Sequence, residues 1–158
     1  SGIGFVKAYD KIADETREEI NVGTEGDIKD QKAKYRMYDK TRIKKCMIKN
    51  ERLKENDGKP FTWKIKPKER IETKEGYLKK GTYVQVSAIM GFKEEHPETH
   101  IAIGIIDEDG EETYIENGVN LVSHLKVKKD GRYRVFLENL GAKKAIAGGH
   151  YMVITEEE

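Results

Sequence analysis

The sequence predicts a mainly β fold: an antiparallel, jelly-roll-like sandwich of about eight short strands, preceded by a charged helical segment. Two observations support this fold class. Runs of β-type residues separated by turn residues recur at short intervals after Asp57-Gly58-Lys59-Pro60, a spacing typical of sandwiches rather than of strand-helix-strand units. Before that point the chain has no proline and little strict alternation. We therefore expect a charged, mainly helical segment at 1–58 and a sandwich domain at 59–158.

The N-terminal segment reads as two helices. Residues 4–20 place apolar side chains near the helical period, with charged residues between them. Residues 24–55 are rich in Lys, Arg and Glu and carry an apolar stripe, which Arg42 and Lys49 interrupt. The competing interpretation makes "KYRMY" and "TRIKKCMI" two short strands around Asp39-Lys40. We favour the helix and leave the strands open as the alternative.

The strand signal is stronger from Pro60 onward. "FTWKIK" alternates Phe61, Trp63 and Ile65 with polar residues, as expected of a strand with one dry and one wet side. Further strands are predicted at "YVQVSAIM", "HIAIGIID", "ETYIE", "LVSHLKV", "RYRVFLEN" and "KAIAGGHYMVI". Asp107-Glu108-Asp109-Gly110 lacks the spacing of a calcium loop and predicts a hairpin turn, because glycine supplies the positive φ of a tight turn. We expect a second hairpin at Lys129-Asp130-Gly131 by the same reasoning.

The sequence offers no recognisable catalytic or metal centre. No serine lies in a G-x-S-x-G elbow, and no phosphate-binding loop is present. His96 and His100 have a ligand-like spacing, but Pro97 lies between them and no HExxH pattern occurs. The single cysteine, Cys46, excludes an intramolecular disulfide and a multi-cysteine zinc site. We therefore expect no enzyme activity, no metal and no cofactor.

The charge pattern points to a binding role. The net charge is only +1, so the overall balance indicates no specific nucleic-acid partner. Residues 29–54, however, carry eleven Lys or Arg against three acidic residues. Such a stretch can contact an anionic envelope surface or a protein partner, or can simply be a solvated face. The candidate contact residues are Lys32, Arg36, Arg42, Lys44 and Lys45. The alternative is a carbohydrate- or peptide-binding sandwich that uses exposed aromatic residues such as Trp63 or Tyr77.

The segments "GTYVQVSAIM", "HIAIGIIDEDGEETYI" and "HLKVKKDGRYRVFLENLG" carry a family resemblance. They resemble a β-sandwich module of extracytoplasmic proteins of Gram-positive bacteria, such as the C-terminal tail of membrane antirepressor proteins of the β-lactam-sensor type. The cadence DG-x-Y-x-V-x-x-x-N is also similar to bacterial pre-peptidase C-terminal domains. The likeness spans about residues 60 to 154 and lacks the sensor's metallopeptidase signature. It implies a non-catalytic module outside the membrane.

Three expectations about location follow. No apolar run approaches the roughly 20 residues that a membrane span needs. Because the chain begins at Ser1 rather than at Met, we expect any signal peptide or anchor to lie upstream. The expected location is extracytoplasmic, with anchoring through those upstream residues.

Overall fold

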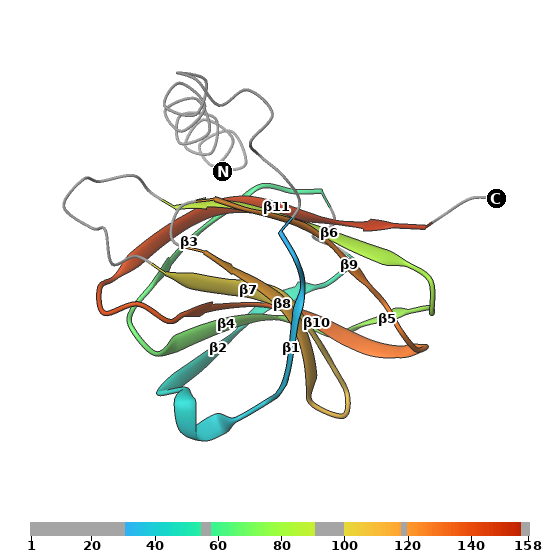
Figure 1. Ribbon diagram of the computed structural model, residues 1–158, viewed down its shortest axis with the longest axis horizontal. Helices are drawn as coiled ribbons and strands as arrows, with labels where there is room; N and C mark the ends of the chain where they lie inside the picture. Colours follow the sequence, from blue (N-terminus) through green and yellow to red (C-terminus); the bar gives the residue numbers. More distant parts are fainter. Residues whose placement is uncertain (1–30, 55–57, 91–99, 118–119, 156–158) are drawn as a thin grey trace, which may run out of the picture.

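Two facing β-sheets make up the computed structural model, which describes residues 31–54, 58–90, 100–117 and 120–155 (Figure 1). The larger sheet has seven strands in the order β1-β8-β7-β10-β4-β2, and β5 pairs with β10. The smaller sheet has the order β3-β11-β6-β9. The β2–β4 pair is parallel and the other pairs are antiparallel. The mainly β, antiparallel-rich character predicted from the sequence is confirmed.

The larger sheet contains β1 (Lys34–Met37), β2 (Lys45–Arg52), β4 (Glu69–Lys74), β5 (Gly76–Leu78), β7 (Ile101–Asp107), β8 (Glu111–Asn117) and β10 (Gly131–Asn139). The smaller sheet contains β3 (Phe61–Ile65), β6 (Tyr83–Met90), β9 (Asn120–Lys126) and β11 (Ala145–Ile154). A single 3-10 turn, η1 (Lys40–Arg42), joins β1 to β2. Every strand that we predicted after Pro60 is present, and β4 and β5 were missed.

The core lies between the two sheets and follows the alternation of the strands. In β6 every second residue, from Val84 to Met90, is buried. In β3 the buried residues are Phe61, Trp63 and Ile65, and the rings of Phe61 and Trp63 stack with their centroids 4.0 Å apart. Gly149 allows β11 to approach β6, because a Cβ there would lie 2.1 Å from the backbone oxygen of Ser87. The dry face predicted for β3 is therefore correct.

The predicted helix over 24–55 is wrong for its described part. Residues 34–37 and 45–52 are strands, paired with β8 and β4, and η1 is a short turn between them. The alternative of two strands around Asp39 is the correct one. Partners distant in the sequence outweigh local helix propensity here, because Glu112 and Glu138 bind the arginines of this segment. The predicted helix over 4–20 lies outside the described residues.

The two Asp-Gly turns differ. Asp107 to Gly110 joins β7 to β8 as a hairpin: Asp107 accepts hydrogen bonds from the backbone of Asp109 and Glu111, and Gly110 has φ of 87°. The turn at 129–131 is not a hairpin, because β9 lies in the smaller sheet and β10 in the larger one. Asp130 instead accepts a 2.7 Å hydrogen bond from the backbone N–H of Lys80, which fixes an arch between the sheets. Within the described residues, no helix has the length and apolarity to span a membrane.

Candidate binding surface

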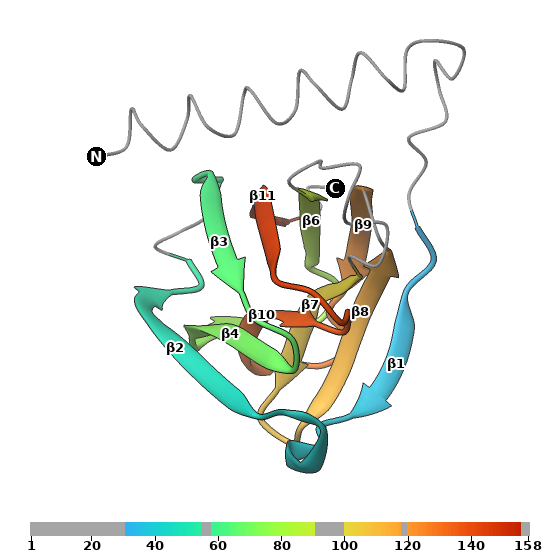
Figure 2. The same cartoon turned by 90° about the vertical axis from the view of Figure 1, so that its left-hand side faces the viewer.

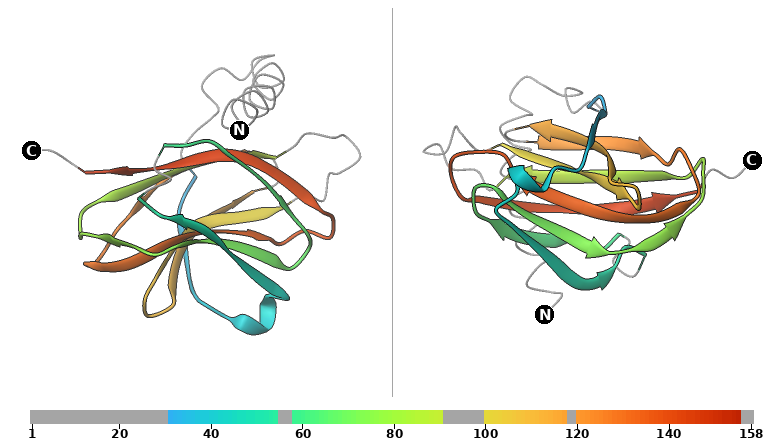
Figure 3. Two further views of the ribbon diagram at one scale, coloured as in Figure 1. Left: turned by 180° about the vertical axis from the view of Figure 1, so that it is seen from behind. Right: turned by 90° about the horizontal axis from the view of Figure 1, so that it is seen from below.

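Residues 34–52 form a strap that runs from one edge of the larger sheet to the other. β1 lies at one edge and β2 at the opposite edge, and the connection through η1 crosses the outer face of the strands between them (Figures 2 and 3). The backbone N–H of Tyr38 donates to the oxygen of Gly110, so the strap is also fixed to the β7–β8 turn. The strap therefore covers charged residues that would otherwise face water.

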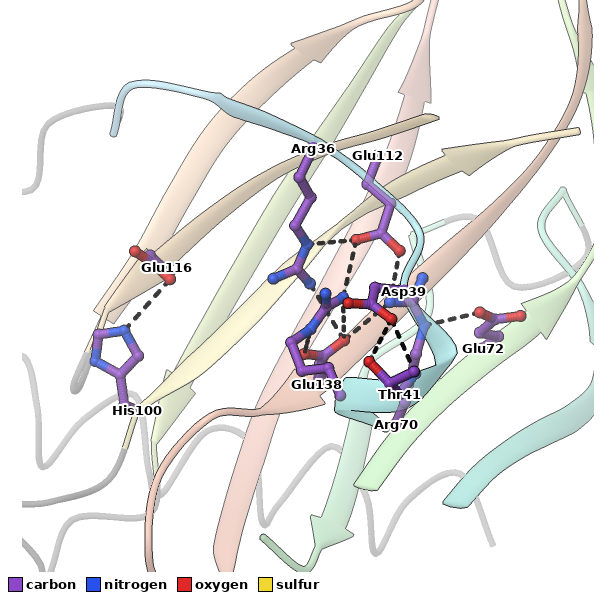
Figure 4. A network of polar contacts seen from close by, with 10 residues as sticks. Arg36, Asp39, Thr41, Arg70, Glu72, His100, Glu112, Glu116 and Glu138 are labelled. Atoms are coloured by element: carbon purple, nitrogen blue, oxygen red, sulfur yellow. Dashed lines mark hydrogen bonds and ion pairs between the residues drawn. The ribbon is translucent and has the colours of Figure 1, made fainter. Parts of the chain in front are cut away.

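Beneath the strap lies a buried ionic cluster centred on Arg70 of β4 (Figure 4). The guanidinium of Arg70 lies 2.8 Å from Glu72, 2.7 Å from Glu112 and 2.9 Å from Glu138. Arg70 and Glu112 have no exposed surface, and Glu138 has almost none. Charges so deeply buried are tolerated only when they are paired and hydrogen-bonded.

Two strap arginines complete the cluster from above. Nε of Arg36 donates to Glu112 at 2.6 Å, and Nε of Arg42 donates to Glu138 at 2.9 Å. Burial would by itself raise the pKa of Glu138, but the hydrogen bond from Arg42 and the nearby arginine charges outweigh it and lower the pKa below its ordinary value. Glu138 is therefore held as a carboxylate, and the strap is joined to the sheet by ion pairs.

Aromatic rings hold the guanidinium groups in position. The ring of Phe136 lies 3.8 Å from the guanidinium carbon of Arg70, and the ring of Tyr114 lies 4.3 Å from that of Arg36. Stacking of this kind is favourable because the face of an aromatic ring carries negative charge. With its acids already paired, the cluster acts as an anchor for the strap.

The five residues predicted as contacts do not share one environment. Arg36 and Arg42 are turned into the ionic cluster, with side chains 18% and 30% exposed. Lys32, Lys44 and Lys45 are exposed. The structure therefore separates two arginines that hold the strap from three lysines that face outward.

A trough lies against the β2 part of the strap and is lined by residues of β2, β4, β5, β7 and β10. Its basic lobe, of about 690 Å³, is lined by Arg52, Lys54, Glu75, Gly76, Tyr77 and Arg132. Its acidic lobe, of about 470 Å³, is lined by Tyr38, Cys46, Ile48, Glu72, Ile106, Asp107, Glu108 and Arg134, together with Glu75 and Arg132. Glu75 and Arg132 line both lobes, so the two hollows are neighbours that meet at this ion pair.

Cys46, in the acidic lobe, is poorly suited to nucleophilic chemistry. Burial of the thiol and the neighbouring charge of Glu72 raise its pKa to about 11. The thiolate, which is the reactive form, is therefore rare at neutral pH. The charges of Arg70 and Arg134 act in the opposite direction, but burial and the charge of Glu72 outweigh them.

Ser87 and His150 are registered opposite each other across β6 and β11. Burial lowers the pKa of His150. A serine nucleophile needs a histidine that a third, acidic group orients. The positions registered around this pair are Gln85, Val122 and Met152, which include no carboxylate. No group of three or more His, Cys, Asp or Glu that could hold a metal occurs in the described part of the chain. The absence of enzyme activity and of a metal stays a prediction.

The acidic residues of the cluster were missed in the sequence. Glu72, Glu112 and Glu138 lie among many other carboxylates, and β4, which carries Arg70 and Glu72, has the charged sequence "ERIETK". One signal was available: Phe136 and Glu138 alternate with the apolar residues Val135 and Leu137 in a strand that was predicted correctly. A charged residue that shares a strand face with Phe136 indicates a covered outer face.

Comparison with known proteins gives little. No family model matches the chain, and no curated protein matches it. A solved structure similar to the chain is that of Aeromonas hydrophila PliG, a periplasmic lysozyme inhibitor of g-type lysozyme, at 10% sequence identity and a TM-score of 0.38. The match covers 68% of this chain and 98% of that chain. A likeness of this size carries no argument about function. The resemblance stated from the sequence and the extracytoplasmic location therefore stay predictions.

Proposed function

We propose that the chain is a non-catalytic binding module of a bacterial envelope-associated protein, and that its strap docks on an acidic surface of a protein partner. The concentration of exposed apolar side chains on the strap carries this proposal. Six large apolar side chains are exposed among the described residues, and four of them belong to the strap: Tyr35, Met37, Tyr38 and Ile48. An excess of exposed apolar groups on one segment is typical of an interaction surface, and Tyr and Met are enriched at protein interfaces.

The charge of the strap specifies an acidic partner. Lys40, Lys44, Lys45 and Lys49 are all exposed on the same segment. Opposite charge on a partner would steer the encounter and fix its orientation. Because Arg36 and Arg42 hold the strap in place, little conformational freedom is lost on binding.

A protein partner is favoured over an anionic bilayer by the acids beside the strap. Glu72, Glu75 and Glu108 line the neighbouring trough, and a continuous anionic surface would repel them. A folded protein can present acids to the lysines and leave the trough acids uncovered. The experiment must therefore distinguish binding to a protein from binding to a membrane surface.

Selection from a display library of random peptides, with the intact chain as bait, tests the proposal. We expect selected peptides to be rich in Asp and Glu and to weaken sharply between about 50 mM and about 300 mM salt, as exposed charges are screened. The triple variant K44E/K45E/K49E should weaken the tightest selected peptide by about tenfold or more, measured by fluorescence anisotropy.

The matched control is K64E/K143E/K144E, which reverses three exposed lysines away from the strap. It should leave the affinity within about twofold of the native chain. Equal losses in both triple variants, or selected peptides without acidic residues, would contradict the proposal. Tighter binding to phosphatidylglycerol vesicles than to any selected peptide, abolished by the strap variant, would favour the membrane surface instead.

The alternative from the sequence, a carbohydrate- or peptide-binding sandwich, depends on exposed aromatic residues. Trp63 is only 7% exposed and stacks on Phe61, which counts against it as a platform for a sugar. Tyr77 is 50% exposed and lines the trough. The peptide form of the alternative therefore rests on the trough and not on Trp63.

A further inference from the structure

We propose that the trough binds an extended peptide segment of the partner, with the acidic end of the peptide in the basic lobe and a cationic residue in the acidic lobe. This inference rests on the proposed binding role and specifies which part of the partner enters the molecule. It places the peptide beside the strap, along the outer side of β2, β4 and β5.

The dimensions of the trough suit a peptide. Each lobe lies within the roughly 300–1,000 Å³ of ordinary ligand sites. Glu75 and Arg132 line both lobes, so the lobes are neighbours, and we expect an extended chain to pass over this ion pair from one lobe to the other. Such a chain advances by about 3.3 Å per residue, and its side chains point alternately to opposite sides.

The distribution of charge gives the peptide its direction. The basic lobe has three cations, Arg52, Lys54 and Arg132, against Glu75 alone. The acidic lobe has four carboxylates, from Glu72, Glu75, Asp107 and Glu108, against Arg132 and Arg134. Glu72 also pairs with Arg70, and Asp107 with Lys129, so Glu108 is the carboxylate that we expect a peptide cation to contact. Complementary charge therefore places peptide carboxylates beside Lys54 and a Lys or Arg beside Glu108. The opposite orientation would oppose like charges at both ends.

The ion pair between the two lobes can be exchanged for a contact with the peptide at low cost in stability. Arg132 pairs with Glu75 at 3.1 Å, and both side chains are well exposed. An exposed pair of this kind contributes little to stability, so a peptide carboxylate can replace Glu75 as the partner of Arg132. Below the acidic lobe, Glu72 is fixed by the buried Arg70 at 2.8 Å, so the floor is rigid.

Apolar groups stand at both lobes. Tyr77 lies at the basic lobe, and Tyr38 and Ile48 line the acidic lobe. All three are exposed, and two are tyrosines, which supply contact area at low entropic cost. We expect them to contact alternate apolar side chains of the peptide, which sets a pattern of cation, apolar residues and acids along the sequence.

The probe is a labelled peptide with lysine at one end, alternating Val and Thr in the middle and two aspartates at the other. Fluorescence anisotropy gives its affinity, and amide chemical shifts of the native chain give its position. We expect shifts at Ile48, Gly76, Tyr77 and Arg132. Replacing both aspartates of the peptide by asparagine should weaken binding by about tenfold.

The chain variant is K54E/Y77A, which alters two exposed side chains of the basic lobe. It should weaken the probe by about tenfold or more, whereas K64E/M152A, which makes the same kinds of change on the smaller sheet, should leave it within about twofold. Arg132→Gln is a second lobe variant, in case the first unfolds. Thermal melting of each variant identifies any loss that comes from unfolding.

The two proposals fail separately. If K54E/Y77A and Arg132→Gln both leave the probe and the library-selected peptides unaffected while K44E/K45E/K49E weakens the selected peptides, the trough is not the site and the strap proposal stands. If the lobe variants abolish binding and the strap variant does not, the trough is the site and the strap lysines are not. Amide chemical-shift changes confined to other strands would contradict the proposal that the trough binds the peptide.

Discussion

The two faces of the larger sheet are both buried, but by different means. The inner face packs apolar side chains such as Ile71, Ile103 and Leu137 against the smaller sheet. The outer face buries Arg70, Glu112 and Glu138 beneath the strap. Apolar packing is non-directional and depends on area removed from water, whereas buried charges need partners at defined positions.

This difference shows why the strap has an ordered place. The inner face would stay buried with many combinations of apolar residues of the right volume. On the outer face, the single cation Arg70 faces three carboxylates, and Arg36 and Arg42 of the strap supply the further positive charge that balances them. The ionic cluster therefore specifies where the strap lies, and the exposed binding groups are positioned as a consequence.

The largest effect should come from removing the centre of the cluster. Arg70→Met leaves Glu112 and Glu138 buried without their shared guanidinium, and breaking a buried pair costs about 3–5 kcal/mol. Urea unfolding should report this loss. The control is the adjacent inner-face residue of the same strand: Ile71→Val should cost about 0.5–1.5 kcal/mol. Equal losses of unfolding free energy for Arg70→Met and Ile71→Val would contradict the idea that the two faces are stabilised by different means.

A smaller, pH-dependent effect should follow from Arg42→Gln. Its hydrogen bond to Glu138 is partly exposed, so we expect a loss of about 1 kcal/mol at neutral pH. The pKa of Glu138 is lower in the folded chain than its ordinary value. Stability from this carboxylate is therefore fully present above the unfolded pKa of about 4.3 and is lost as pH falls through the folded pKa.

Urea unfolding of the native chain and of Arg42→Gln should consequently converge in acid, once Glu138 is protonated. Arg132→Gln serves as the control, because Arg132 pairs with the exposed Glu75 and should cost less at neutral pH. A constant gap between the native chain and Arg42→Gln down to strongly acidic pH would mean that the Arg42–Glu138 pair does not stabilise the strap.

The same contrast explains what the sequence could predict. Alternating apolar residues revealed β3 and β6, because an inner face leaves a period of two in the sequence. The outer face of β4 leaves no such pattern: Arg70 and Glu72 in "ERIETK" look like surface residues, and their burial depends on the strap, which is a separate segment of the chain. The strap was predicted as a helix because its strand partners, β8 and β4, are likewise separate segments of the chain.

The candidate site was predicted in part. The basic segment was recognised from its composition, but the sequence could not separate Arg36 and Arg42, which are paired inward, from Lys44 and Lys45, which face outward. That separation depends on which lysines and arginines lie within reach of Glu112 and Glu138. The trough was not predicted, because part of its lining comes from β4 and β5, which were missed, and part from β2, which was predicted as a helix.

The smallest effect should come from an ion pair at the exposed edge of the strap. Lys34 pairs with Glu116, and this hydrogen bond raises the pKa of Lys34 and lowers that of Glu116. Desolvation acts in the opposite direction on both groups and is the smaller effect. The Lys34 side chain is more than half exposed, so solvent screens the pair. We expect Lys34→Gln to leave the midpoint of urea unfolding unchanged within error. A loss like that of Arg70→Met would show that exposed lysines also hold the strap. If Lys34→Gln leaves the stability unchanged, as expected, charges on the open side of the strap can be changed without loosening it. The strap variant K44E/K45E/K49E then measures binding alone.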